Sequence, residues 1–568
     1  MHRYATALSC LCVALLVACN TTPIRNKSSG LVVDVPQVAH PQGETPAWWY
    51  RSGAARAAGN GAMNGRAKNV ILFLGDGMSL TTVAAARILE GQRKGNPGEE
   101  NSLSWEQFPH TAFSKTYNTD SQTPDSAGTM TAITTGVKTH MGAIGVTAGD
   151  RNDCADSLGK AALTWLELAG SAGLATGIVS TARLTHATPA ATYAHAPDRN
   201  WENDTDLPAS AVARGCTDIA RQLVAPRFGT GPVVILGGGR SEYTTVEQRD
   251  PEYDDKVGQR LDGRDLVGEW KRAHPRGAYV WNAQQMESAK DAPALLGLFE
   301  PDHMQFEHDR DKGLNGEPSL AQLTTTAIRT LSRNPDGYVL MVESGRIDQA
   351  NHYGNAYRAL DETIALSDAV RAAAEATSGD DTLIIVTADH SHTLNFVGYP
   401  VRGNPILGKV RGMGGEDDTP GDFARDATGQ MFTTLTYANG PGNTGPSNQQ
   451  PSGPKRFLHA PSGFEPVEGR PDLSQVDTEH PDYLQESLVP LKSESHGGED
   501  VGIWARGPGS EAVRGTVEQN VIYHFIVQAA PKLRERLCAA GTCDAQGVPV
   551  ELPKPADFES AAAKRPNQ

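Results

Sequence analysis

Short apolar runs that end in acidic residues or histidine are the feature that most constrains the fold of this chain. One run, at 70–74, leads into Gly75-Asp76-Gly77 and is followed by a stretch with helical apolar spacing. Similar runs recur at 175–179, 233–236, 338–342 and 383–387, with helical patterns between several of them. Strands that are buried on both faces and alternate with helices are typical of parallel sheets. We therefore predict an α/β fold with a doubly wound, largely parallel central sheet flanked by helices.

Residues with metal-binding chemistry follow several of these predicted strands. Ligands gather at the carboxyl ends of strands in open α/β sheets. The sequence Asp-His-Ser-His at 389–392 follows one run, and Glu343 follows another. Asp348 and His352 are four residues apart, so one face of a helix can present both to one ion. Each set alone would more often be structural, but together with His496 they predict a site for several metal ions.

Ser126 is the candidate nucleophile. It precedes the sequence TMTAITTG, which predicts the start of a helix, and its hydroxyl could simply cap that helix. The functional alternative places the hydroxyl beside a metal ion and the helix N-terminus, which both favour an alkoxide and a bound anion. The segment lacks the G-x-S-x-G pattern, so a hydrolase triad is not expected.

The N-terminus carries an export signal. Residues 1–18 contain an apolar stretch too short to span a bilayer, and Leu-Val-Ala-Cys ending at Cys19 resembles the bacterial lipobox. We predict a lipoprotein that is anchored to a membrane through Cys19 by a tether at 19–45, exported, and either in the outer membrane or facing the periplasm. An ordinary signal peptide with incidental cysteines is the alternative. The C-terminus lacks a hydrophobic tail, so we do not expect a GPI-type anchor.

Export also bears on the cysteines. Four lie outside the signal: Cys154, Cys216, Cys538 and Cys543. An even number outside the cytosol predicts two disulfides. Cys538 and Cys543 flank a short loop and can pair locally, which leaves Cys154 to pair with Cys216. Buried free thiols are the alternative.

Composition restricts the partners and the domain organisation. The 568 residues include 67 acidic and 51 basic side chains, a net charge of −16, so we do not expect nucleic acid as a partner. The segment 393–482 is rich in Gly, Pro and Asn and predicts a loop-rich insertion with one strand at 430–437. The core then divides into 46–392 and 483–543, and a C-terminal tail follows at 544–568, which we expect to be loosely ordered from about residue 551.

Six segments resemble, in order, the motifs of the alkaline phosphatase family: FLGDGM, TPDSAGTMTAITTGVKT, HATPAATYAHAPDRNW, VESGRIDQANH, VTADHSH and SHGGEDV. Others, including ARGCTDIARQL and RLDGRDLVGEW, resemble its animal branch. The resemblance covers nearly the whole chain after the tether. It implies a homodimeric phosphomonoester hydrolase with two zinc ions and one magnesium ion. Such an enzyme acts through a phosphoserine and releases inorganic phosphate and an alcohol.

The resemblance also implies a role for each matching residue. Ser126 matches the nucleophile, and Arg199 matches the arginine that holds the phosphate oxygens. The matching ligands are Asp348, His352 and His496 for the first zinc, Asp76, Asp389 and His390 for the second, and Asp76, Thr188 and Glu343 for magnesium, with His186 just outside. His392 matches a histidine that orients a ligand carboxylate. Gln349 stands near the phosphate, where the family has Lys, His or an aromatic residue.

Animal members of the family hold a structural calcium ion, and part of its site is matched here. Glu252, the Phe299 carbonyl and Glu300 match three of the ligands, and Glu317 is the nearest candidate for the last. Ordinary surface acids are the alternative. The alternative functions are a sulfatase, which needs a different setting around its nucleophile, a phosphodiesterase, which lacks the full magnesium set, and a non-catalytic surface lipoprotein, which would have lost ligands.

Overall fold

The computed structural model describes residues 31–38, 43–147, 153–413, 420–466 and 469–560. The predicted signal at 1–18, Cys19 and much of the tether therefore lie outside the described residues, as does the end of the tail at 561–568. Within the described part, no helix is both long enough and apolar enough to cross a membrane.

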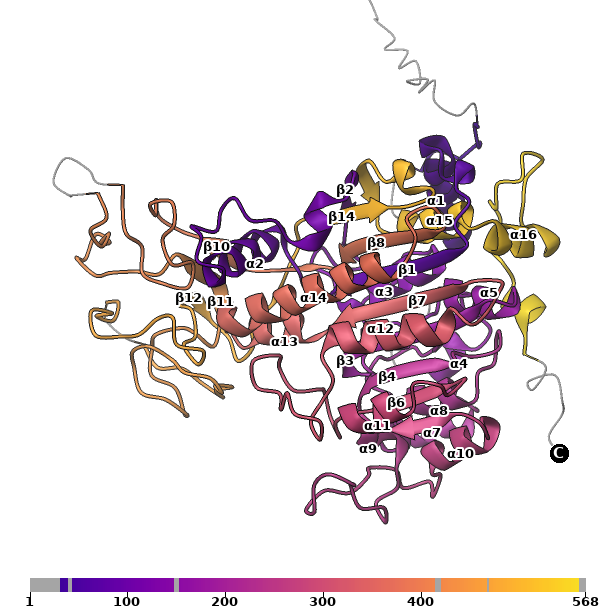
Figure 1. Cartoon of the computed structure of the whole chain (residues 1–568), viewed down its shortest axis with the longest axis horizontal. Coiled ribbons are helices and arrows are strands. Elements are labelled where there is room, and N and C mark those ends of the chain that lie inside the picture. The colour runs from indigo at the N-terminus through magenta and orange to yellow at the C-terminus, as the bar shows by residue number, and fades with distance from the viewer. Residues whose placement is uncertain (1–30, 39–42, 148–152, 414–419, 467–468, 561–568) are drawn as a thin grey trace, which may run out of the picture.

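A ten-stranded sheet forms the centre of the molecule (Figure 1). The strands, in their order across the sheet, are β15 (Gly515–Glu518), β2 (His110–Lys115), β14 (Val501–Arg506), β8 (Thr382–Ala388), β1 (Asn69–Gly75), β7 (Tyr338–Ser344), β3 (Ala175–Arg183), β4 (Val234–Gly238), β6 (Leu295–Leu298) and β5 (Ala278–Val280). The pairs from β8 to β5 are all parallel, whereas β14 is antiparallel to both β8 and β2. The predicted α/β fold with a largely parallel sheet is confirmed.

Side chains of the central strands alternate between two apolar cores. In β1, Val70, Leu72 and Leu74 belong to one core, and Ile71 and Phe73 belong to the other. The first core is covered by α1 (Pro46–Asn60), α3 (Ser126–Thr135), α5 (Trp165–Ser171), α15 (Val521–Ala529) and α16 (Pro531–Ala539). The second is covered by α2 (Leu80–Arg93), α12 (Leu320–Leu331) and α14 (Ala356–Ala376). The sheet is therefore wound on both faces, and its central strands β1, β7 and β8 are buried at every position and mainly apolar.

Shorter helices connect these layers. They are α4 (Cys154–Ser157), α6 (Ala187–Ala190), α7 (Ala209–Ala213), α8 (Ile219–Val224), α9 (Arg240–Tyr243), α10 (Leu266–Ala273), α11 (Ala283–Ser288) and α13 (Arg346–His352). The 3₁₀ turns are η2 (Ala62–Asn64), η3 (Ser104–Gln107), η4 (Asp204–Asp206), η5 (Ser510–Ala512) and η6 (Pro555–Phe558).

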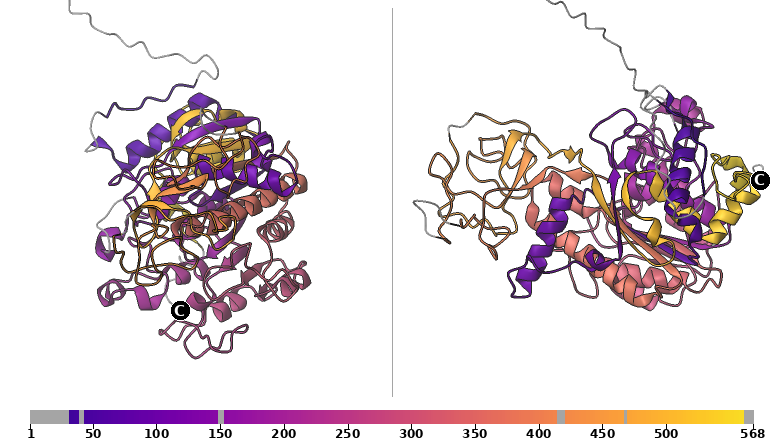
Figure 2. Two further views of the ribbon diagram at one scale, coloured as in Figure 1. Left: turned by 90° about the vertical axis from the view of Figure 1, so that its left-hand side faces the viewer. Right: turned by 90° about the horizontal axis from the view of Figure 1, so that it is seen from above.

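The segment after β8 is dominated by loops and stands out on one side of the core (Figure 2). It contains β10 (Leu394–Phe396) and β11 (Leu435–Gly440), which pair with each other, and β11 also pairs with β12 (Ser487–Pro490). The strand expected at 430–437 thus begins later, at Leu435, because Met431 and Thr433 form only isolated bridges to neighbouring loops.

The register of the central strands brings their carboxyl ends to one edge. Gly75 of β1 lies opposite Ser344 of β7 and Ala388 of β8. Asp76, Gly345 and Asp389, which come next in the chain, therefore begin three neighbouring loops at this edge. A small two-stranded sheet, β9 (Ser391–His392) with β13 (His496–Gly497), brings the distant His496 to the same place.

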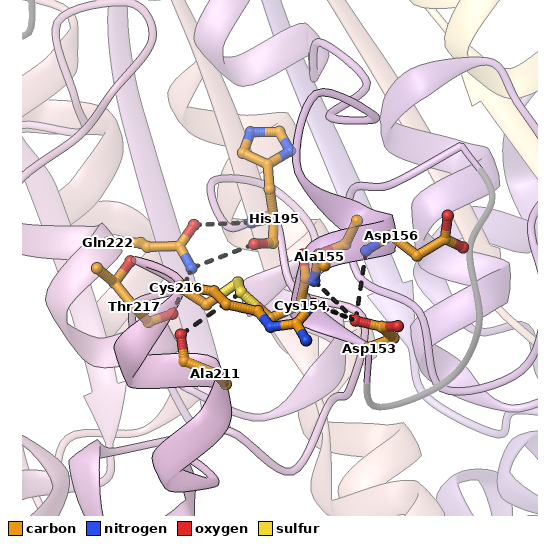
Figure 3. Close-up of a disulfide and its surroundings, with 11 residues drawn as sticks. Asp153, Cys154, Ala155, Asp156, His195, Ala211, Cys216, Thr217 and Gln222 are labelled. Carbon is orange, nitrogen blue, oxygen red and sulfur yellow. Dashed lines mark hydrogen bonds and ion pairs between the residues drawn. A yellow bond between two sulfur atoms is a disulfide. The ribbon is translucent and has the colours of Figure 1, made fainter.

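Both predicted disulfides are present. Cys154 is bonded to Cys216 (Figure 3), and Cys538 is bonded to Cys543. The tail is better ordered than expected: Phe558 is buried in the first core, and Ser560 donates a backbone hydrogen bond to Arg227 O. Apolar packing of Phe558 is the reason that this part of the tail folds back onto the core.

Candidate active site

The turn after β1 places Asp76 in the interior. Gly77 has a φ of +66°, and a Cβ at this position would lie 2.3 Å from the His392 ring, so only glycine fits here. The Gly77 N–H donates to Asp389 Oδ1 at 3.1 Å. Asp76 and Asp389 are both fully buried, so two neighbouring strand ends present carboxylates to the same interior space.

One group of donors consists of Asp348, His352, His392 and His496, whose ligand atoms all lie within 4.8 Å of one another. As predicted, α13 presents Asp348 and His352 on one face. The Nδ1 atom of His352 lies 2.5 Å from Glu494 O, and that of His496 lies 2.7 Å from Pro124 O. Because a carbonyl can only accept, both Nδ1 atoms donate, and each neutral ring keeps its lone pair on Nε2.

These two lone pairs face each other. The Nε2 atoms of His352 and His496 are 3.2 Å apart, and Asp348 Oδ1 is 3.4 Å from each of them. Two acceptor nitrogens and a carboxylate oxygen at such distances repel one another unless a cation lies between them. Imidazole and carboxylate are ligands that zinc binds in proteins. The donor set therefore fits a zinc ion.

A second group joins Asp76, Asp348 and His390. His390 is fully buried, and its Nε2 atom lies 3.5 Å from Asp76 Oδ1 and 3.3 Å from Asp389 Oδ2. The same Nε2 atom is 3.1 Å from Ser126 Oγ. The predicted ligands of the second zinc are thus brought together, with the predicted nucleophile beside them.

A third set of oxygens lies on the far side of Asp76. Thr188 Oγ1 is 3.3 Å from Asp76 Oδ2, and Ser180 donates a short hydrogen bond to Glu343 Oε2. Glu343 Oε1 is buried and has no hydrogen-bond partner among the described residues. Buried polar oxygens are normally satisfied, so this unpaired oxygen fits a hard cation such as magnesium.

The charges in this space strengthen the same conclusion. Asp76, Glu343, Asp348 and Asp389 are all at most 3% exposed. Burial, reinforced by Asp389 and Asp348, raises the pKa of Glu343 to about 8, and the pKa of Asp76 rises for similar reasons. Four carboxylates cannot be ionised together in a protein interior without cations to compensate them.

Ser126 is the first residue of α3, and the capping interpretation of its hydroxyl is wrong. The N-cap is Asp125, whose Oδ1 accepts from Gly128 N at 3.1 Å. Asp125 Oδ2 also accepts from Arg199 Nη1 at 3.1 Å, and Arg199 Nη2 lies 3.2 Å from His186 Nε2. The side chain of Arg199 is thereby held at the N-terminus of α3, next to Ser126.

Two residues in these contacts were missed by the sequence analysis. Asp125 directly precedes the predicted helix start, and an aspartate at that place is a capping signal. Glu494 is buried, accepts a short hydrogen bond from His392 Nδ1, and accepts from Thr393 N at 2.6 Å. Burial would lower the pKa of His392, but Glu494 and Asp348 on either side raise it to about 10. No pattern in the sequence indicated this contact.

His303 was also missed, and it links Gln349 to the magnesium side of the site. Gln349 Nε2 lies 3.0 Å from the nearer His303 ring nitrogen, and Gln349 Oε1 accepts a short hydrogen bond from Arg346. The His303 ring is 5.3 Å from the His186 ring, edge to face. Gln349 and His186 are therefore neighbours through one intervening side chain.

The residues expected to hold calcium lie together outside this site. Tyr253 donates to Glu300 Oε1 at 2.8 Å, Arg240 donates to Glu252 at 2.9 Å, and Glu317 accepts from Gln305 N. Burial and the charges of Glu300 and Glu252 raise the pKa of Glu317 to about 9. Phe299 directly follows β6 and precedes Glu300. Among the described residues, the groups with all ligand atoms within 4.8 Å do not include these acids.

A parallel sheet with clustered carboxylate and imidazole donors at its carboxyl edge, next to a serine at a helix N-terminus, defines a metal-dependent hydrolase of the α/β class. The alkaline phosphatase family model matches residues 67–532. The tissue-nonspecific alkaline phosphatase of Homo sapiens is 42% identical over 474 residues, which cover 82% of this chain and 84% of that protein. The alkaline phosphatase of Gadus morhua is 42% identical over 82% of this chain and 92% of its own length.

Solved structures agree on the fold. The alkaline phosphatase of Thermus thermophilus superposes with a TM-score of 0.57 at 23% identity, covering 84% of this chain and 96% of that one. The enzyme of the Antarctic bacterium TAB5 gives 0.53 at 21% identity, covering 82% and 98%. The chain belongs to the alkaline phosphatase family and is a phosphomonoester hydrolase.

Proposed function

We propose that this enzyme hydrolyses phosphomonoesters through a phosphoserine at Ser126, with two zinc ions and one magnesium ion in the site. The facing Nε2 atoms of His352 and His496, 3.2 Å apart with both Nδ1 atoms committed to carbonyls, are the observation that carries the proposal. The residues that would hold the ions are Asp348, His352 and His496 for one zinc, Asp76, Asp389 and His390 for the other, and Asp76, Thr188 and Glu343 for magnesium. A solved variant of the TAB5 enzyme holds magnesium, which supports the third site.

When bound, the three ions supply positive charge that stabilises the attacking and departing oxygens of an in-line displacement. The protein's own residues do the positioning. Ser126 Oγ loses its proton and attacks phosphorus, the bond from phosphorus to the ester oxygen breaks, and the departing alkoxide takes up a proton and leaves as the alcohol. Water then loses a proton as it attacks the phosphoserine from the opposite side, the bond from phosphorus to Ser126 Oγ breaks, Ser126 regains a proton, and inorganic phosphate is released. Helix α3 aims its N-terminal amides at the space beside Ser126, where they favour an anion.

Arg199 is proposed to bind the phosphate oxygens. Its planar guanidinium can present two parallel N–H donors to the phosphoryl group, which a lysine could not do. Asp125 Oδ2 lies 3.1 Å from Arg199 Nη1 and His186 Nε2 lies 3.2 Å from Arg199 Nη2, and these contacts hold the guanidinium in place. The ions and Arg199 together outweigh the four carboxylates and an ionised Ser126 in formal charge. The small positive remainder suits a monoester dianion better than a diester monoanion.

Three further features belong to the proposal. Glu252, the Phe299 carbonyl, Glu300 and Glu317 would hold a structural calcium, and the raised pKa of Glu317 supports a cation there. The enzyme would form a homodimer, as the family resemblance implies. It would be exported and tethered through a lipid on Cys19, facing the periplasm or in the outer membrane.

The test of the activity compares three substrates with metal content measured in parallel. Purified metal-loaded protein should cleave a phosphomonoester far faster than a phosphodiester or a sulfate ester, with two zinc and one magnesium bound per chain. Preference for the diester or sulfate ester would identify another metal-dependent hydrolase instead. Absence of any turnover with all ions bound would favour a non-catalytic surface protein.

A further inference from the structure

The backbone that carries Arg199 has little regular structure of its own. It leaves α6 at Ala190 and reaches Arg199 through an irregular stretch. Ala196 and Ile144 exchange two backbone hydrogen bonds of 2.9 Å, and Arg199 N donates to Gly142 O at 2.9 Å. The position of the guanidinium therefore depends on what fixes residues 192–196.

His195 is the side chain that fixes this stretch to the core. Its ring is largely buried, with Nδ1 2.7 Å from Gly145 O and Nε2 2.9 Å from Glu167 Oε1. Gly145 has a φ of +59°, and a Cβ there would lie 2.2 Å from Ala194 O, so only glycine allows this approach. A carbonyl and a carboxylate both accept hydrogen bonds. Both ring nitrogens must therefore donate, which makes His195 an imidazolium paired with an ionised Glu167.

The partner of His195 is itself rigidly held. Glu167 lies in the first turn of α5, where its Oε2 accepts from Thr164 N at 2.9 Å and its own N–H donates to Thr164 Oγ1. Thr164 Oγ1 in turn donates to Thr192 O at 2.7 Å. The N-terminus of α5 thus holds residues 192–196 in place through hydrogen bonds to both Thr192 and His195.

Gln222 forms hydrogen bonds with the backbone of His195. The His195 N–H donates to Gln222 Oε1 at 2.9 Å, and Gln222 Nε2 donates to the carbonyls of His195 and Thr217 (Figure 3). Thr217 follows Cys216 of the first disulfide. Every hydrogen-bonding group of His195 is therefore engaged, and its partners Gly145, Glu167 and Gln222 are not among the predicted metal ligands.

We infer that the His195–Glu167 ion pair positions Arg199, holding residues 195–199 so that the guanidinium stays at the phosphate site; this rests on the proposed role of Arg199. The pair is a positioning device, since neither member reaches the reacting atoms. Burial opposes the charge of His195, but Glu167 and the bond to Gly145 outweigh it and raise the pKa of the ring. Arg227 also faces His195, and its positive charge opposes protonation of the His195 ring. The Phe228 ring packs edge-on against the His195 ring.

The test is Glu167→Gln, which is isosteric and can keep the bond to Thr164 N while removing the charge. Inorganic phosphate is the probe, as a competitive inhibitor of the metal-loaded enzyme, alongside KM and kcat for a monoester. We expect the inhibition constant and KM to rise roughly tenfold, which corresponds to the loss of one charge-assisted hydrogen bond, with a smaller change in kcat.

Glu106→Gln is the matched control. Glu106 accepts from Leu103 N at 2.9 Å and from Arg87 at 2.6 Å, outside this stretch, and its loss should leave phosphate affinity unchanged.

Two further readouts separate positioning from general stability. In the wild type, phosphate affinity should fall as pH rises through the raised pKa of His195. In Glu167→Gln this fall should be absent, because the His195 ring is neutral throughout. In an Arg199→Ala background, Glu167→Gln should have no further effect. Additive effects in that cycle, or wild-type phosphate affinity in Glu167→Gln, would overturn the inference. If Arg199→Ala alone left phosphate affinity intact, the proposed role of Arg199 would fail instead. His195→Gln serves the same design should Glu167→Gln not fold.

Discussion

Removing the metal ions should make the stability of this protein strongly pH-dependent, and Glu343 allows the size of the effect to be calculated. Its carboxyl is fully buried, and burial with the charges of Asp389 and Asp348 raises its pKa from 4.5 to about 8. A shift of this size corresponds to about 5 kcal/mol, at 1.36 kcal/mol per pKa unit. Divalent ions remove this contribution of Glu343 when bound, because they compensate the carboxylate in place of a proton.

The direction of the pH dependence follows from the linkage between proton binding and folding. The folded apoprotein holds the proton of Glu343 more tightly than the unfolded chain does, so its free energy of unfolding should fall as pH rises from about 4.5 to about 8. Asp76 and Asp389, whose pKa values are also raised, act in the same direction. Burial opposes ionisation of Asp348, but its histidine neighbours outweigh burial and lower its pKa, so its contribution to stability is lost only at lower pH.

The assay is equilibrium unfolding in urea at pH 5, 6, 7 and 8, with and without a chelator. Between pH 5 and 8, Glu343→Gln should lose about 3.5 kcal/mol of the pH-dependent change in the apoprotein and little in the metal-loaded protein, because the full shift is reached only above the folded-state pKa. Glu362→Gln is the matched control: Glu362 is also buried with a pKa of about 8, but it lies outside the predicted ligands. Its loss should flatten the profile equally with and without metal. Apoproteins of the wild type and Glu343→Gln with the same pH profile would refute the reasoning.

Two other predictions concern the rim of the site and the anchor. Gln349→Lys should weaken magnesium binding and change phosphate affinity, because it adds a positive charge near the metals, and His186→Asp should recover part of the loss. Strictly additive effects in this double-mutant cycle, measured as magnesium dependence of activity, would mean that the His303 bridge between the two positions does not couple them. Cys19→Ser should move the protein from the membrane fraction to the soluble fraction with activity retained, as followed by detergent partitioning. A lipidated variant would contradict the lipobox.

The sequence was sufficient for the centre of the sheet. Strands such as β1, β7 and β8 are buried at every position, so they appear as continuous apolar runs. The strands at the β15 end were not predicted. In β2 the buried and exposed positions alternate, but the buried side chains are Ala112 and Ser114 while Phe113 is exposed, so the apolar pattern does not show the strand. Its partners β14 and β15 lie far away in the chain. Pairing of this kind depends on tertiary contacts that a local pattern does not contain.

The same distinction applies to the site. The spacing of Asp348 and His352 on α13 was predictable because helix geometry is local. Glu494 was not, because it acts through His392, which is 102 residues away in the chain. The ion pair of His195 and Glu167 likewise depends on a packing contact between α5 and an irregular loop. Residues that hold ligands in place are visible only once the fold has brought them together.

The most direct test of the phosphoserine mechanism is to trap the intermediate. Metal-loaded enzyme is mixed with a phosphomonoester, quenched in acid, digested and examined by mass spectrometry. The account predicts a phosphate on Ser126 and on no other residue. Ser126→Ala should bind the metals normally but lose roughly a thousandfold or more in turnover. Phosphate on a different residue, or near-wild-type turnover by Ser126→Ala, would contradict it.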